Sequence, residues 1–199
     1  MKTRYLSTAV LLTSALVLTG CGSGGSDTAG SSDSPAGTSA TSTKGNDADI
    51  SFLTGMKPHH EQAVEMSEMV LAANPPAEVA AIATQIKGAQ APEIEQMNTM
   101  LADLGQKSDG AAHGGGHGSG AGHGGMMSDQ MMAELDGATG TDAARLYLEG
   151  MVRHHEGAIE ASDAELKDGK YEPALTLARE IKQAQAAEIT AMQALLGKL

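Results

Sequence analysis

The sequence predicts an all-α protein in which two copies of one helical hairpin pack into a four-helix bundle. Residues 52–61 return as residues 147–156, and residues 86–94 return as residues 181–189, both at an offset of 95 positions without a gap. Ala, Leu, Met, Glu and Gln, which favour helices, dominate the chain after residue 48. Because an isolated hairpin cannot bury its apolar faces, we expect the two hairpins to pack against each other.

The first 20 residues have the form of a bacterial lipoprotein signal peptide. Lys2 and Arg4 supply the positive start, residues 5–17 are mostly apolar, and residues 18–21 read as a lipoprotein cleavage box. The apolar run is too short for a membrane-spanning helix. We therefore expect lipidation of Cys21, which would hold the mature chain on the extracytoplasmic face of the cell membrane. The alternative is an ordinary secreted protein with a stray cysteine near its cleavage site.

Residues 21–48 are expected to be a disordered tether, because they are rich in Gly, Ser, Thr and Asp and almost lack large apolar side chains. Removing Lys2 and Arg4 leaves 11 basic and 25 acidic residues, a formal net charge of −14. This acidic balance argues against nucleic acid as a partner and favours cations. Plain solubility would explain the acidic surface equally well.

The elements of the helical part follow in order along the chain. The first hairpin, residues 49–105, holds helices over about 49–73 and 76–104, with Asn74 available to cap the second. A glycine-rich connector, residues 106–140, could form a short helix over about 126–135. The second hairpin, residues 141–199, holds helices to about 167 and from about 172, separated by a turn at 168–170.

Polar side chains repeat on faces that should be buried. On a helical wheel, His59 and His60 flank the apolar stripe through Met56, and the wheel slightly favours His60 as the inward member. Glu93 falls near the middle of the stripe on the next helix. A carboxylate buried without a partner costs several kcal/mol, so Glu93 requires a proton, a cation or a metal.

The repeated residues form a candidate set of metal ligands. They are Met56, His59, His60, Glu93 and Met97 in the first copy and Met151, His154, His155, Glu188 and Met192 in the second. The connector adds a secondary set, which is His113, His117, His123, Met126 and Met127. Two interpretations stay open: a metal held by these groups, or His–Glu pairs that only fix helix packing in a structural or protein-interaction bundle. The connector could likewise be a plain flexible linker.

Copper is the ion that this ligand set favours, because thioether sulfur suits Cu(I) and imidazole suits copper in general. Zinc lacks its usual cysteine ligands here, although His and carboxylate could serve. Iron is not excluded, but the Glu-x-x-His spacing of di-iron bundles is absent from the inward positions. No nucleotide loop, catalytic thiol or Ser/His/Asp arrangement indicates an enzyme, so a metal-dependent oxidoreductase is the least favoured reading.

Two prolines distinguish the copies. Pro58 precedes His59 and Pro92 precedes Glu93, whereas the second copy has Arg153 and Ala187 at these positions. Because proline removes a helical hydrogen bond and bends the helix, we expect a kinked first hairpin with the more open and exchangeable site.

These motifs resemble those of the domain-of-unknown-function 305 family of exported bacterial proteins. The resemblance covers roughly residues 50–199 and rests on the His-pair motifs at 56–60 and 151–158, the lead-in at 126–135, and two triples, Gln90/Glu93/Met97 and Gln185/Glu188/Met192. The family's usual Trp-Leu after the second-helix methionine is replaced by Met100-Leu101 and Leu195-Leu196. The resemblance implies a ferritin-like four-helix fold and, because some members are associated with copper binding and resistance, copper handling without catalysis.

The sequence thus predicts an extracytoplasmic, lipid-anchored protein that sequesters or handles copper. The bundle would supply the main ligands, and the connector would supply further ones. The competing prediction is an interaction module whose buried His–Glu pairs bind no metal.

Overall fold

The computed structural model describes residues 44–106 and 124–199, which contain five α-helices and no β-strand. The helices are α1 (Asp47–Ala72), α2 (Ala77–Asp103), α3 (Asp129–Gly137), α4 (Gly140–Asp168) and α5 (Glu172–Leu196). The prediction of an all-α protein is therefore confirmed. Within these two ranges no helix is long and apolar enough to cross a membrane. The predicted signal peptide, Cys21, most of the tether, and His113, His117 and His123 lie outside the described residues.

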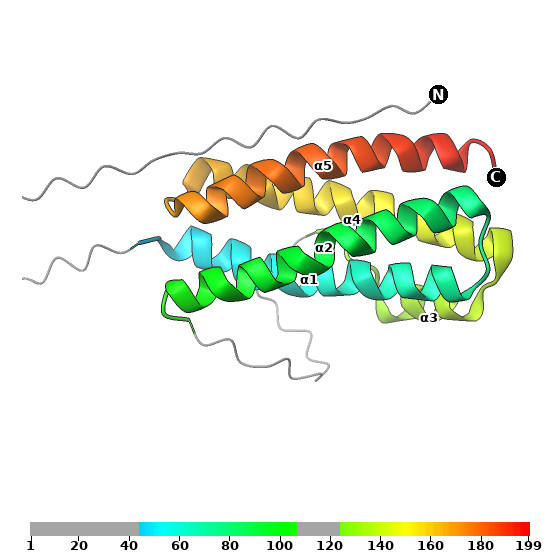
Figure 1. Ribbon diagram of the computed structural model, residues 1–199, viewed down its shortest axis with the longest axis horizontal. Helices are drawn as coiled ribbons and strands as arrows, with labels where there is room; N and C mark the ends of the chain where they lie inside the picture. The colour runs from blue at the N-terminus through cyan, green and yellow to red at the C-terminus, as the bar shows by residue number, and fades with distance from the viewer. Residues whose placement is uncertain (1–43, 107–123) are drawn as a thin grey trace, which may run out of the picture. The chain divides into compact units, whose positions relative to one another are not determined.

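The four long helices pair as two antiparallel hairpins, α1 with α2 and α4 with α5 (Figure 1). The hairpins pack together mainly through α1 and α4, while α2 and α5 meet over a much smaller area. The short helix α3 packs against α1 and α4. The α2–α5 side is therefore the more loosely closed side of the helical domain.

The apolar core is divided into two clusters by a polar layer. One cluster contains Phe52, Leu53 and Met56 of α1, and the other begins at Ala63 of the same helix. On α4 the division falls between Met151 and Ala158. His59, His60, His154 and His155 occupy the intervening positions, and all four are fully buried. The sequence thus places its repeated histidines between two hydrophobic cores.

The start of α1 is tied to the turn between α4 and α5. The Asn46 side chain accepts hydrogen bonds from the backbone of Ala48 and Asp49, and the Asp49 carboxylate accepts one from the backbone N–H of Asn46, which completes a capping box. Asp49 also accepts hydrogen bonds from the backbone N–H groups of Lys170 (2.9 Å) and Tyr171 (2.8 Å). One carboxylate therefore joins the first helix to the second hairpin.

The start of α2 differs from the sequence prediction. Asn74 does not cap this helix; it adopts a left-handed conformation with φ of 54°, which Asn tolerates better than most residues. The residue before the first turn of α2 is Pro76, which offers no side-chain hydrogen bond. The Pro75-Pro76 pair keeps the chain extended after Asn74, so the helix begins at Ala77.

Glu165 of α4 is buried beside the Asp49 carboxylate. Its side chain is only 2% exposed, and its partner is the Asp49 carboxylate, with which it shares a hydrogen bond. Burial, followed by the contact with Asp49, raises the pKa of Glu165 to about 8. For Asp49, burial alone would raise the pKa, but hydrogen bonds from the backbone of Tyr171 and Asn46 hold it below its usual value. The pair therefore favours a proton on Glu165 and a charge on Asp49.

We predict that Glu165 makes the protein less stable as the pH rises. Between its usual pKa of 4.5 and its folded pKa of about 8, folded Glu165 keeps a proton that the unfolded chain has lost. The free energy of unfolding therefore falls across this window as the pH increases. Glu165→Gln should remove this contribution, because a neutral amide can donate to Asp49 at every pH. The free energy of unfolding of Glu165→Gln should equal that of the wild type at pH 4.5 and exceed it by about 1–3 kcal/mol above pH 8.

Urea unfolding of the wild type and Glu165→Gln across this pH range measures the difference. Glu160→Gln is the matched control, because Glu160 lies on the same helix with an exposed side chain. A gain for Glu165→Gln that does not grow with pH would contradict the assignment of the proton to Glu165.

Candidate functional site

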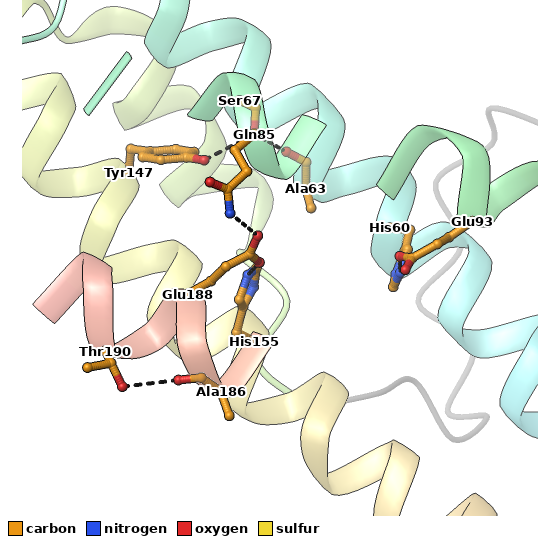
Figure 2. Close-up of polar contacts among 10 residues, drawn as sticks. All are labelled: His60, Ala63, Ser67, Gln85, Glu93, Tyr147, His155, Ala186, Glu188 and Thr190. Atoms are coloured by element: carbon orange, nitrogen blue, oxygen red, sulfur yellow. Dashed lines mark hydrogen bonds and ion pairs between the residues drawn. The ribbon is translucent and has the colours of Figure 1, made fainter. Parts of the chain in front are cut away.

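Each repeat places a histidine of one helix against a glutamate of the next. His60 of α1 donates from Nε2 to Oε2 of Glu93 on α2 at 2.8 Å, and His155 of α4 donates from Nε2 to Oε2 of Glu188 on α5, also at 2.8 Å (Figure 2). Both pairs join residues 33 positions apart. Both imidazoles are fully buried, while the Glu93 and Glu188 side chains are 19% and 8% exposed. The sequence repeat is therefore reproduced as a repeat of contacts.

The other histidine of each pair connects the two repeats. The rings of His59 and His154 lie with their centroids 3.6 Å apart and their planes inclined at 37°. The His59 Nε2 also lies 3.3 Å from the backbone carbonyl of Gly124. The helical wheel placed both histidines of each pair beside the apolar stripe and slightly favoured His60 and His155 as the inward members; in the structure all four rings are buried. The reason is that α1 and α4 each bury two faces, one toward the hairpin partner and one toward each other.

The buried layer keeps at least one imidazole neutral. Burial, and then the nearby rings of His59, His155 and His60, hold the pKa of His154 well below its usual value of 6.5. A protonated ring here would have to lose its hydration and face three other imidazoles. Neutral imidazole is the form that binds metal ions, so His154 needs no proton release before it can act as a ligand.

Several buried polar atoms of this layer have no hydrogen-bond partner in the described structure. They are Nδ1 of His60, Nδ1 of His155, the amide of Gln90 and Oε1 of Gln185. In a neutral imidazole that donates from Nε2, Nδ1 carries the lone pair. Since buried polar atoms normally have partners, this concentration at repeated positions fits a bound ion. The glutamates would then orient the histidines from the opposite side of each ring.

The predicted methionine ligands border the layer from both sides. Met56 and Met97 belong to one apolar cluster, Met151 and Met192 to the other, and all four are fully buried. Residues 44–106 and 124–199 nevertheless contain no group of three His, Cys, Asp or Glu side chains placed to hold an ion. The structure thus brings the predicted residues together as pairs, and an ion would need thioether sulfur or a local shift to complete its coordination.

The end of the connector is docked on the helices near this layer. Gln62 of α1 accepts a hydrogen bond from the backbone N–H of Met127 (2.8 Å) and donates to its carbonyl (2.9 Å). Met127 is buried, while Met126 is 41% exposed. Sequence reasoning missed Gln62. The residue 95 positions later is Gly157, and this difference between the two copies was the available signal.

Glycines of α4 permit this docking. A Cβ at Gly157 would lie 1.6 Å from the carbonyl oxygen of Gly124, and a Cβ at Gly150 would lie 2.7 Å from Sδ of Met127. Both positions face the segment that leads into α3. Glycine is therefore required at Gly157, where two stretches of backbone meet, whereas the neighbour of Gly150 is the flexible end of the Met127 side chain.

The fold and the site define an all-helical protein in which each of two repeats buries two histidines, one of them hydrogen-bonded to a glutamate. The family model described as domain of unknown function DUF305 matches residues 49–196, and the chain belongs to the DUF305 family. No curated protein matches the chain.

Solved structures of three related proteins share the fold. A DUF305 protein of Streptomyces coelicolor, described as a candidate secreted protein, is 30% identical with a TM-score of 0.68; the match covers 76% of this chain and 93% of that one. A DUF305 fragment from Deinococcus radiodurans is 29% identical with a TM-score of 0.67, covering 77% and 98%. CopM has been solved with copper in two oxidation states. The Cu(II)-bound form is 26% identical with a TM-score of 0.64, and the Cu(I)-bound form is 24% identical with a TM-score of 0.62. Each match covers 75% of this chain and 96% of CopM.

We predict that Gly157→Ala destabilises the protein by about 1–3 kcal/mol, because the new methyl group would collide with backbone that has little room to move. Gly88→Ala is the matched control: a Cβ at Gly88 of α2 would meet no atom within 4 Å, so the helix propensity of Ala should add about 0.5–1 kcal/mol. Urea denaturation of both variants measures the difference. Equal stability of Gly157→Ala and the wild type would show that residues 124–127 do not lie against α4 in solution.

Proposed function

We propose that this protein binds copper outside the cytoplasm and sequesters or transfers it. The observation that carries the proposal is the pair of His–Glu contacts whose imidazoles each leave a buried Nδ1 without a partner, in a layer bordered by buried methionines. The Cu(I)-bound and Cu(II)-bound structures of CopM, a protein of the same fold, support the choice of copper.

The proposed ligands divide between the repeats. His60, with Met56 and Met97, serves the first site, and His155, with Met151 and Met192, serves the second. Glu93 and Glu188 supply negative charge to each site and hold the imidazole orientation. His59 and His154 lie between the repeats and are available to either site. Copper would contribute affinity for sulfur and nitrogen ligands, and the protein would hold it away from bulk solvent.

The proposal also assigns a cellular location to the protein and roles to the segments outside the two sites. Lipidation of Cys21 would anchor the protein, and residues 21–48 would let the helical domain stand away from the membrane. The described helices would form a ferritin-like four-helix bundle, and His113, His117, His123, Met126 and Met127 would be secondary ligands. The Streptomyces coelicolor relative, described as a candidate secreted protein, supports an extracytoplasmic location.

A structural role is the second candidate, and one observation favours it. Both His–Glu pairs are closed hydrogen bonds of 2.8 Å that already satisfy one oxygen of each carboxylate. Such pairs can fix the register of two helices without any ion. In this alternative, the protein is an interaction module on an acidic tether.

Metal titration of the full chain separates the two candidates. We expect Cu(I), added anaerobically against a competing chelator, to bind more tightly than about micromolar, which corresponds to about −8 kcal/mol. Glu93→Gln with Glu188→Gln should weaken binding by about 10–100-fold, because the supporting charge is lost while an acceptor oxygen remains for each imidazole. Cu(II), Zn(II) and Fe(II) provide the comparison that identifies the preferred ion.

Two controls complete this experiment. Glu95→Gln changes an exposed glutamate of α2 and should leave binding unchanged. Replacing His113, His117 and His123 with Ala should reduce stoichiometry at most, if the main sites lie in the helices. If no ion binds at micromolar concentration, the copper proposal is wrong and the structural role stands.

A further inference from the structure

We propose that Gln85 is a positioning residue that makes the two copper sites unequal, with the second-repeat site at His155 the tighter and the first-repeat site at His60 the more exchangeable. This inference rests on the proposed function. It specifies which site takes up copper first and which residues determine that order.

The Glu188 carboxylate is held at both oxygens. His155 donates to Oε2 at 2.8 Å, and Gln85 donates from Nε2 to Oε1 at 3.1 Å (Figure 2). Gln85 belongs to α2, so this contact crosses from the first repeat to the second. With both oxygens engaged, Glu188 cannot rotate away from His155 without losing a hydrogen bond. The two hydrogen bonds therefore favour the orientation of Glu188 that meets the His155 ring.

The Glu93 carboxylate lacks the corresponding support. The residue at the repeat offset from Gln85 is Glu180 of α5, whose side chain is exposed. A glutamate cannot donate to a carboxylate at neutral pH, and its charge would oppose that of Glu93. Among the described residues, His60 is the only hydrogen-bond partner of Glu93. The Glu93 side chain is also more exposed than that of Glu188, at 19% against 8%.

The surroundings of Gln85 place this contact at the solvent boundary. Gln85 and Glu188 line a groove of about 620 Å³ between α2 and α5, together with Ala81, Ala184, Ala187 and Ala191. The small side chains leave the approach to Glu188 open, so Gln85 is the polar side chain that meets Glu188 from this groove. Gln85 is itself exposed. An outer hydrogen bond that favours the bound orientation of a ligand raises metal affinity, because less freedom is lost when the ion binds.

Site-resolved titration of the full chain tests the inference. His60→Ala with Glu93→Gln leaves the second site as the reporter, and His155→Ala with Glu188→Gln leaves the first. In the second-site reporter, Gln85→Ala should weaken copper binding by about 10-fold, and Gln85→Glu should weaken it further by adding a like charge. In the first-site reporter, Glu180→Gln should strengthen binding, because position 180 corresponds in the repeat to Gln85 and an amide there would be the counterpart of the one that meets Glu188.

The crossed combinations are the controls: Gln85→Ala in the first-site reporter and Glu180→Gln in the second-site reporter should leave affinity unchanged. A spectroscopic measurement adds a readout that packing alone would not move. With one equivalent of Cu(II), the paramagnetic resonance spectrum of the wild type should match the second-site reporter, and Gln85→Glu should shift it toward the first-site reporter.

The possible outcomes separate this inference from the proposed function. If neither reporter binds copper, the copper proposal itself fails. If both bind, but Gln85→Ala changes only the unfolding midpoint and neither affinity nor spectrum, Gln85 is purely structural and the inference is overturned. Equal affinity of the two reporters would overturn it as well.

Discussion

The rest of the structure depends on two imidazole–carboxylate hydrogen bonds in the middle of the helical domain. Each bond joins the helices of one hairpin, His60 to Glu93 and His155 to Glu188, and each lies between two apolar clusters. Removing one partner would leave polar atoms of the other buried without a hydrogen bond, at a cost of about 1–3 kcal/mol. Hydrophobic packing drives the helices together, and these pairs determine which residues of α1 and α2, or of α4 and α5, stand opposite each other.

The sequence predicted this layer because it placed a charged side chain at a position that should be buried, where the charge requires a partner. A glutamate at the repeated position on an apolar stripe needed a partner, and a histidine on the facing helix was the nearest candidate. The contact between His59 and His154 could not be predicted in the same way, because a wheel does not show which other helices a face will meet, and α1 contacts both α2 and α4. The docking of Met127 on Gln62 and the Asp49–Glu165 pair were also missed, since they join segments whose proximity only the tertiary fold creates.

The two repeats preserve their proposed ligands and differ in what surrounds them. Gln62 of the first copy holds the end of the connector, while its counterpart Gly157 provides the space into which that segment fits. Pro58 and Pro92 lie inside continuous helices of the first hairpin and have no counterpart in the second. Identical ligands in different surroundings give different affinities, because the outer contacts set how much each ligand must reorganise.

Charge balance bears on which oxidation state such a site would favour. Each repeat contributes one carboxylate to its histidine, while thioether sulfur and a metal-bound imidazole contribute no charge. In the proposed sites, Cu(I) with one carboxylate is neutral, whereas Cu(II) leaves one positive charge in a layer enclosed by apolar clusters. An uncompensated charge in such surroundings is strongly disfavoured. The arrangement should therefore stabilise Cu(I) over Cu(II).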